Sequence, residues 1–334
     1  MEILKLNLLF LIFQGNRRES LLREILGKRI ISFDFRNDNE IFYGSLEYFF
    51  GKTRLSSFKE WDLDFQPTVD DIIVVNIPWD YILNLKIPLP TVKNKKEIDK
   101  LLLLEITQNL GIQPEQIYYD YLITSNNIAN VFVVKKEELQ NYFQNLYAKK
   151  IPEPDILYPD FFKESILLSR FTGYSMQLFI NKKYSGMLVF NDSDLIEVRY
   201  SDLSLKNFDE VLLDEFGYSV YELEYIDDET LIKDVKAFLM NFFSDFLSLI
   251  EREVFITINS MEEKIGLENI QTIQIVTDSN IINELLKEHY DDSTLLLNRF
   301  FFQDFIPLVK HYRFLGVLGL LKRGGISVGK IKLI

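Results

Sequence analysis

The sequence predicts an α/β protein, and three stretches carry that prediction. Residues 72–123 contain, in order, a β-branched strand, a second apolar strand, a charged helix and a third strand. Residues 174–200 contain three apolar segments separated by polar turns, and residues 231–253 place apolar side chains at helical spacing. Strands that alternate with helices in this way are typical of sheets covered by helices.

The composition is that of a large, acidic, globular chain. Its 334 residues are 47% hydrophobic and 26% charged, which is enough to build a sizeable core. The formal net charge of −13 argues against nucleic-acid binding, because phosphate binding needs clustered Lys and Arg. There is no Cys, so neither a disulfide framework nor a zinc–thiolate site is expected. The two histidines, His289 and His311, are far apart in sequence and do not predict a metal site.

The most apolar run lies near the N-terminus, at residues 3–13. It is shorter than the roughly 20 residues that a membrane-spanning helix needs. Its balanced charges and the lack of a small-residue cleavage site argue against a signal peptide. We expect it to pack on the body of the protein or to result from a misplaced start codon, and we expect a short polar helix at Ser20–Lys28.

The first confident strand is Arg29–Phe35, with Asp34 near its end. A polar turn with Asn37 and Asn39 follows, and a second strand begins at Ile41. Asn and Asp suit a tight turn.

The central stretch has clear boundary signals. A strand at Ile72–Ile77 stops at Pro78. The helix Lys95–Leu110 stops at Gly111, and Pro114 prevents it from resuming. The flanking strands are expected at Tyr81–Leu89 and Ile117–Ile123.

The remaining elements follow from the same patterns. We expect strands at residues 129–134, 174–179, 186–190, 195–200 and 270–276. We expect helices at residues 136–147, 231–253, 281–289 and 312–323, and an irregular acidic segment at 202–229. Gly316 and Gly319 should allow the last helix to pack closely, and Asp278 and Ser279 should cap the helix that follows them.

This order of elements resembles that of the PilM-type pilus assembly proteins, of which the cytoplasmic lobe of the type II secretion protein GspL is a relative. Residues Tyr119–Ile123 are similar to the Leu-Asp-Tyr-x-Leu strand of that family, and Gly319–Gly324 to its C-terminal helix. Residues 156–170 match in placement the helix that ends the first lobe of that family, so the resemblance implies a helix there. The resemblance implies an actin-like, ribonuclease H-like fold of two lobes. Lobe I would span residues 1–170, with an inserted subdomain at about 72–150. Lobe II would span residues 171–334, with its last helix packing back on lobe I.

The resemblance also implies where a nucleotide would bind in catalytic relatives. The corresponding positions here are Asp34, Asn37, Asn39, Asp278 and Ser279. The glycines of both phosphate turns and of the adenosine shelf are missing, so we expect no catalysis, no cofactor and no metal. The alternative is an actin-like protein that binds ATP with magnesium and switches partner binding or polymerisation. A sugar kinase relative is a third reading, which the same missing glycines disfavour.

For function, the resemblance implies a cytoplasmic scaffold at the inner face of the inner membrane, in a type IV pilus or type II secretion-like assembly. It would bind the cytoplasmic tail of an inner-membrane partner as an added strand, in a groove between the first lobe and the subdomain. The candidate contacts are Ile87, Leu89, Tyr119 and Tyr121, unless these side chains belong to the core. The residues Leu6-Asn7-Leu8-Leu9 resemble the Asn-Leu-Leu motif of such tails and would then be a tethered mimic. A homo-oligomer is left open.

Overall fold

The computed structural model describes residues 28–37, 40–49, 52–63, 67–90, 94–261, 265–289, 299–306 and 308–328. The expectations for residues 1–27 and for Asn39 lie outside this range. The chain forms two compact units. The first contains the described residues up to Leu167 and those from Gly316 onward, and the second contains Leu168–Leu315.

The first unit is built on a sheet with the strand order β3-β2-β1-β5-β9, in which β4 also pairs with β2. The strands are β1 (Lys28–Asn37), β2 (Glu40–Phe49), β3 (Lys52–Leu55), β4 (Lys59–Glu60), β5 (Ile72–Ile77) and β9 (Ile156–Pro159). β1 is antiparallel to β2 and parallel to β5, and β5 is parallel to β9. Both faces of the central strands are buried, which fits their nearly continuous apolar sequences.

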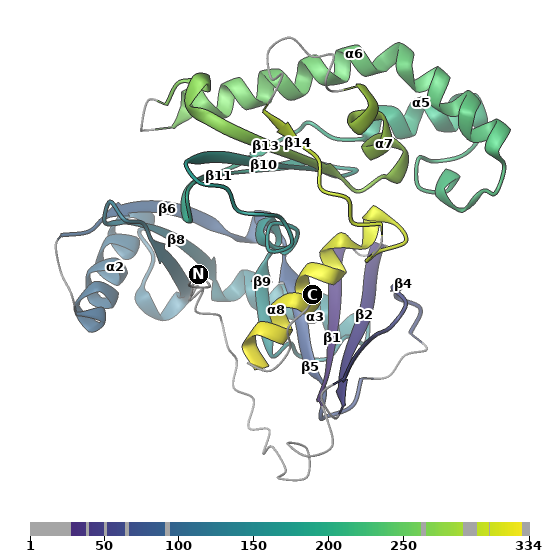
Figure 1. Ribbon diagram of the computed structural model, residues 1–334. Coiled ribbons are helices and arrows are strands. Elements are labelled where there is room, and N and C mark those ends of the chain that lie inside the picture. The colour runs from purple at the N-terminus through teal and green to yellow at the C-terminus, as the bar shows by residue number, and fades with distance from the viewer. Residues whose placement is uncertain are drawn as a thin grey trace. The chain divides into compact units, whose positions relative to one another are not determined.

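Helices cover both faces of this sheet (Figure 1). On one face lies α8 (Leu315–Val328), where the Ser32 hydroxyl donates a hydrogen bond to the Val317 carbonyl at 3.0 Å. On the other face lies α3 (Lys136–Ala148), whose Leu139, Tyr142 and Leu146 pack into one apolar cluster with the strands. A Cβ at Gly319 would collide with the Lys163 carbonyl, so the expected close packing at the last helix is confirmed.

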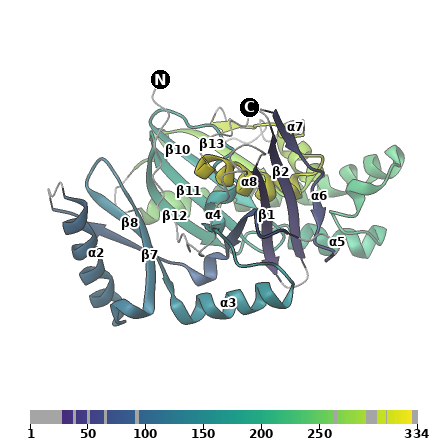
Figure 2. The same ribbon diagram turned by 90° about the horizontal axis from the view of Figure 1, so that it is seen from below.

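A smaller sheet in the same unit has the order β6-β8-β7. It consists of β6 (Leu83–Pro88), β7 (Ile117–Ile123) and β8 (Ile128–Lys135), all antiparallel. The helix α2 (Lys95–Leu110) covers one of its faces (Figure 2). The inserted subdomain was expected at about residues 72–150, but this sheet and its helix span only residues 83–135. The strand β5 pairs in the large sheet instead, and α3 packs against that sheet.

The second unit has a sheet of order β12-β11-β10-β13-β14. The strands are β10 (Tyr174–Ile180), β11 (Ser185–Asn191), β12 (Asp194–Ser201), β13 (Ile270–Thr277) and β14 (Phe300–Phe301). Three antiparallel strands are followed by two that run parallel to β10. This repeats the order and directions of β3-β2-β1-β5-β9, so both units share one topology.

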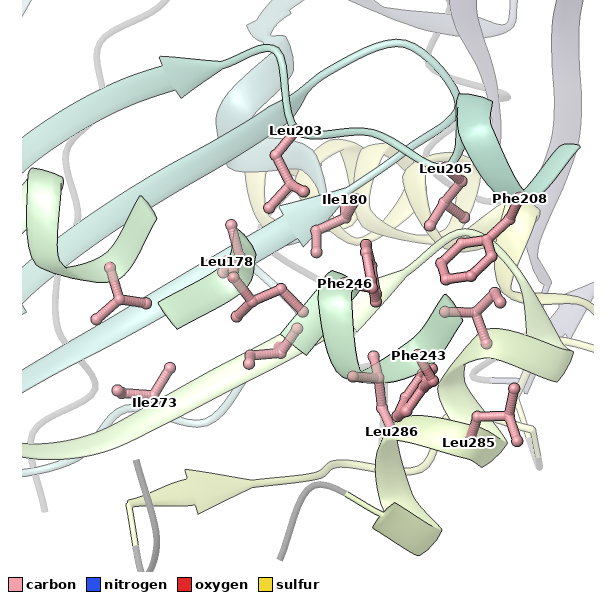
Figure 3. Packing of buried hydrophobic residues seen from close by; sticks show 14 of the residues in the cluster. Leu178, Ile180, Leu203, Leu205, Phe208, Phe243, Phe246, Ile273, Leu285 and Leu286 are labelled. Carbon is pink, nitrogen blue, oxygen red and sulfur yellow. The ribbon is translucent and has the colours of Figure 1, made fainter. Parts of the chain in front are cut away.

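Three helices build the core of the second unit with this sheet. They are α5 (Lys206–Phe216), α6 (Glu229–Ser260) and α7 (Asn280–His289). Phe243 and Phe246 of α6 pack into one cluster with strand residues such as Leu178 and with Leu286 of α7 (Figure 3). None of the helices within the described ranges combines the length and the apolar character that crossing a membrane requires.

Two predicted elements were wrong. Residues 156–170 were expected to be helical, but Ile156–Pro159 form β9 and only Asp160–Lys163 form a short helix, α4. Parallel pairing with β5 buries Ile156, Leu157 and Tyr158, so this segment departs from the helix that the resemblance implied.

Residues 202–229 were expected to be irregular but contain α5. Its Phe208 packs edge-on against Phe246 of α6 at a ring distance of 4.8 Å. Gly217 ends the helix at a φ of 74°, a conformation that suits glycine.

Other boundaries shifted. Trp79–Tyr81 form a 3₁₀ turn before β6, α6 continues to Ser260, and Tyr312–Phe314 form a 3₁₀ turn before α8.

Candidate functional site

The clearest polar site in the first unit surrounds Asp34, near the end of β1. Asp34 is fully buried in the sheet that α8 covers. The Lys163 ammonium lies 2.7 Å from its Oδ1, and Nε of Arg36 lies 3.3 Å from its Oδ2. A Cβ at Gly316 of α8 would collide with the same carboxylate. Asp34 is therefore enclosed by two cations of the chain itself and by helix backbone.

Lys163 connects Asp34 to a wider buried network. Its Nζ lies 2.5 Å from Oδ1 of Asp160, and the Asn76 amide donates to the same oxygen at 2.8 Å. Asn76 also donates to the Phe35 carbonyl at 2.9 Å and accepts from the Phe35 N–H at 2.7 Å. The network thus joins β1, β5 and α4.

Burial and charge act in opposite directions on this network. Burial alone would raise the pKa of the Asp34 carboxyl, but the Lys163 and Arg36 charges hold that pKa below its ordinary value. Burial alone would lower the pKa of the Lys163 ammonium, but Asp160 and Asp34 hold it above its ordinary value. Both groups are therefore charged at neutral pH, as a compensated buried ion pair requires.

This arrangement leaves little capacity for a metal or a phosphate at Asp34. A divalent cation at the carboxylate would have to displace Lys163 from a buried pair, which is costly. Across the described ranges, no group of three or more His, Asp or Glu side chains is placed to hold a metal ion. The side chain of Asn37, like Asn39, lies outside the described part of the chain.

The hairpin between β10 and β11 is where the resemblance would place the second phosphate turn of catalytic relatives. The Asn181 Oδ1 accepts hydrogen bonds from the N–H groups of Lys183 and Tyr184, at 2.8 and 3.0 Å. The Lys182 ammonium lies 2.9 Å from Oδ2 of Asp209 and above the ring of Tyr221 at 5.5 Å. The Lys182 ammonium is therefore paired within the second unit.

The turn after β13 contains Asp278 and Ser279 and is where the resemblance would place the adenosine shelf of catalytic relatives. Both residues are buried, and Oδ1 of Asp278 accepts from the Tyr221 hydroxyl at 2.8 Å. The Ser279 hydroxyl accepts from the Ile282 N–H at 3.4 Å, at the start of α7. Side chains of the protein fill this turn. Asp34 in the first unit and the pair Asp278 and Ser279 in the second are each bonded within their own unit.

The four residues expected to contact a partner lie on the side of the small sheet that faces α2. Ile87 is buried there, and Leu89, Tyr119 and Tyr121 pack against the same cluster. The tyrosine hydroxyls donate to Asp99 of α2, at 3.1 Å to its carbonyl and 2.7 Å to its carboxylate. A partner could reach the Ile87 side chain only by displacing α2.

The opposite face of the small sheet carries Asp120 and Phe132, which are paired across β7 and β8. The Phe132 ring packs against Phe161 and Phe162, at 5.3 and 5.7 Å. Our sequence reasoning missed Asp120. Side chains alternate along a strand, so an Asp between two core-facing tyrosines could have been assigned to the other face.

Asp120 has an unusual environment. Its Oδ1 accepts from the Tyr121 N–H at 2.8 Å, and its buried Oδ2 has no hydrogen-bond partner among the described residues. Burial raises the pKa of the Asp120 carboxyl to about 7, although the Tyr121 N–H and the charges of Lys95 and Arg323 act in the opposite direction. A buried acceptor without a donor costs stability, so such groups are candidates for ligand contact.

The Lys163 network makes a stability prediction. Lys163→Gln leaves Asp34 and Asp160 buried without their cation, so the free energy of unfolding should fall by about 3–5 kcal/mol in urea denaturation. Adding Asp34→Asn should recover part of the loss, because one uncompensated charge is removed. Lys135→Gln, which breaks the exposed pair with Glu138, is the control and should cost less than about 1 kcal/mol. If Lys163→Gln also cost less than about 1 kcal/mol, Lys163 would not be needed to compensate the buried Asp34 and Asp160.

Asp120 makes a pH prediction. Its pKa is higher in the folded protein than in the unfolded chain, so the folded state loses stability as pH rises from about 4 to about 7. Asp120→Asn abolishes this titration. Its unfolding free energy relative to wild type should therefore rise between pH 4 and pH 8, by at most about 4 kcal/mol. Glu115→Gln, at an exposed position before β7, should show no such trend. If the unfolding free energy of Asp120→Asn relative to wild type fell with pH, the conclusion that burial raises the pKa of Asp120 would be wrong.

We compared the sequence and the structure with those of known proteins. No family model and no curated protein matches the sequence. Among solved structures, the chain is similar to that of the PilM–PilN type IV pilus biogenesis complex, at 13% identity and a TM-score of 0.60, covering 88% of this chain and 98% of that one. It also matches the cytoplasmic domain of EpsL, an inner-membrane component of the Vibrio cholerae type II secretion system, at 10% identity and a TM-score of 0.41, over 80% and 98% of the two chains.

A further match is a Bacteroides thetaiotaomicron protein with an actin-like ATPase fold, at 13% identity and a TM-score of 0.39, over 88% and 96% of the two chains. At these identities the similarity concerns the fold alone. The conclusion rests on the match to the PilM–PilN complex, which has a TM-score of 0.60. The repeated sheet order of the two units agrees with it. The predicted resemblance is thus confirmed at the level of structure: the chain has an actin-like α/β fold.

Proposed function

We propose that this protein is a non-catalytic scaffold of a type IV pilus or type II secretion-like assembly, which binds the cytoplasmic tail of an inner-membrane partner. The observation that carries the non-catalytic part is the buried Lys163 between Asp34 and Asp160. Phosphoryl transfer depends on positioned phosphate contacts and on metal-binding carboxylates. Here the surviving carboxylate is already neutralised by a side chain of the protein.

The two other loops support the same proposal. Asn181 binds the backbone of its own hairpin, and Lys182 is paired with Asp209. Asp278 is held by Tyr221. A nucleotide would therefore have to displace internal contacts at each of the three positions. The alternative, an ATP-switched actin-like protein, has no comparable observation in its favour.

We propose this assembly because the fold is similar to that of a chain in the PilM–PilN complex, which acts in type IV pilus biogenesis. The net charge of −13 suits a basic partner segment. Cytoplasmic segments next to inner-membrane helices are enriched in Lys and Arg. Long-range attraction would therefore favour a tail of this kind and place the scaffold at the inner face of the membrane.

The proposed contact surface is the outer edge of β7 together with Asp120. Within the described ranges β7 pairs only with β8, so its other edge can accept an added strand. Asp120 covers the Tyr121 N–H and keeps a second, unpaired oxygen. A tail that pairs with β7 would occupy the open edge of the sheet. If the tail also offers an amide or ammonium donor, that donor would bind the unpaired oxygen of Asp120. Tyr119 and Tyr121 would take part through their backbone.

The experiment is a fluorescence titration with a labelled peptide that contains Lys-Leu-Asn-Leu-Leu. The full chain and a variant that begins at Lys28 are both used, because residues 5–9 have the same sequence and would compete. We expect saturable binding that Asp120→Asn weakens about 10- to 100-fold, the range for losing a hydrogen bond to a charged group. Glu115→Gln is the matched control and should bind normally.

Two results would contradict the proposal. One is the absence of binding by either chain at peptide concentrations up to about 1 mM, which corresponds to roughly 4 kcal/mol. The other is equal binding by wild type and Asp120→Asn, which would place the tail elsewhere. A peptide with Ala in place of Asn tests whether the side-chain amide is the donor.

A further inference from the structure

The longest helix, α6, carries a partly exposed apolar stripe along one border of its buried face. Phe242, Leu249 and Ile256 are exposed by 39%, 39% and 38%, whereas Phe243, Phe246 and Ile250 of the same helix are buried. Figure 3 shows the buried side, where Phe243 and Phe246 point into the core. Three large apolar side chains in one exposed row are unusual for a surface that meets only water.

The spacing of the stripe is that of a helix-pairing seam. The three residues are seven apart. Seven residues make about 20° less than two full turns of a straight helix, so the stripe drifts slowly around α6. Two helices that coil gently around each other keep such a stripe in contact along its length. The stripe from Phe242 to Ile256 is about 21 Å long.

Two exposed charges flank the stripe on one side. Asp245 precedes Leu249 by four residues, and Arg252 follows it by three. In a parallel pair of α6 helices, the two-fold axis runs along the seam and places the charged flanks of the two copies on opposite sides of it. Asp245 of one copy and Arg252 of the other would then lie about 10.5 Å apart along the axis and form no pair. In an antiparallel pair centred on Leu249, Asp245 of one copy lies about 1.5 Å along the axis from Arg252 of the other. A two-fold axis keeps both charges on the same side of the seam, so two Asp–Arg pairs form.

We propose that α6 pairs with α6 of a second copy of this chain, antiparallel and centred on Leu249. Phe242 then faces Ile256 of the other copy at both ends of the seam. The surface is self-complementary in shape and charge, as a two-fold interface requires. This interface lies on the second unit and does not depend on the proposed tail binding.

Cysteine crosslinking tests the geometry directly, because the native chain contains no cysteine. Helix axes pack about 8–10 Å apart and Cα atoms lie about 2.3 Å from each axis, which leaves roughly 4–5 Å between facing Cα atoms. This is within reach of a disulfide. Under oxidation, Leu249→Cys should give a covalent dimer. The control Lys233→Cys, at an exposed position away from the stripe, should not.

Mixed crosslinking determines the direction. Phe242→Cys mixed with Ile256→Cys should give a heterodimer, and Phe242→Cys alone should give little dimer. The reverse result would indicate parallel pairing and overturn the proposal. Sedimentation of the full chain supplies the thermodynamic test. Asp245→Arg and Arg252→Asp should each raise the dimer dissociation constant about tenfold or more, and the double variant should restore it.

Several outcomes overturn the inference. They are a chain that stays monomeric in sedimentation, a dimer that Leu249→Asp does not weaken, or single charge reversals that the double variant does not rescue. Circular dichroism of each variant confirms folding, so that a loss of dimer reports the interface.

Discussion

One buried ion pair constrains much of the first unit: the Lys163 ammonium between Asp34 and Asp160. Charges enclosed in a core must be compensated, because an isolated one costs several kcal/mol. The contact of Lys163 with Asp34 joins the end of β1 to α4, and the hydrogen bond from Asn76 to Asp160 joins α4 to β5. The backbone of α8 passes close to the same residues, because a Cβ at Gly316 would collide with the Asp34 carboxylate and one at Gly319 with the Lys163 carbonyl. The same contacts that stabilise this unit occupy the carboxylate that a nucleotide-bound metal would need.

Asp120 shows the opposite situation in the same unit. It is a largely buried carboxylate with one oxygen unpaired among the described residues, and burial raises its pKa to about 7. A protein retains such a group at a cost to stability, and binding sites are where this cost is commonly found. The two carboxylates thus separate two roles. Asp34 has become part of the structure, and Asp120 is suited to meet a partner. The exposed stripe of α6 adds a second surface for association.

Local signals account for what the sequence could predict. Lys95–Leu110 was predicted to the residue, because Gly111 and Pro114 mark its end, and in the structure the Asn94 side chain caps its start. β9 and α5 were missed because pairing with β5 and packing on α6 are tertiary effects. Asp34 could be singled out as a strand-end Asp, but its partner Lys163 is 129 residues away and carries no local signal. Ile87 was proposed for a partner and lies in the core beneath α2, because hydrophobicity alone does not tell a core face from a binding face.

The most direct test of the central claim is calorimetric titration of the full chain with ATP and magnesium, alongside thermal unfolding in the same buffer. If Lys163 and the internally bonded loops close the nucleotide positions, no binding heat should appear at about 1 mM ATP, and the unfolding temperature should stay unchanged. A ligand present at 100 times its Kd would add about 2.7 kcal/mol of stability, so even modest affinity would be visible. Saturable binding that Asp34→Asn abolishes would contradict the account, because Asp34 would then serve a nucleotide-bound metal.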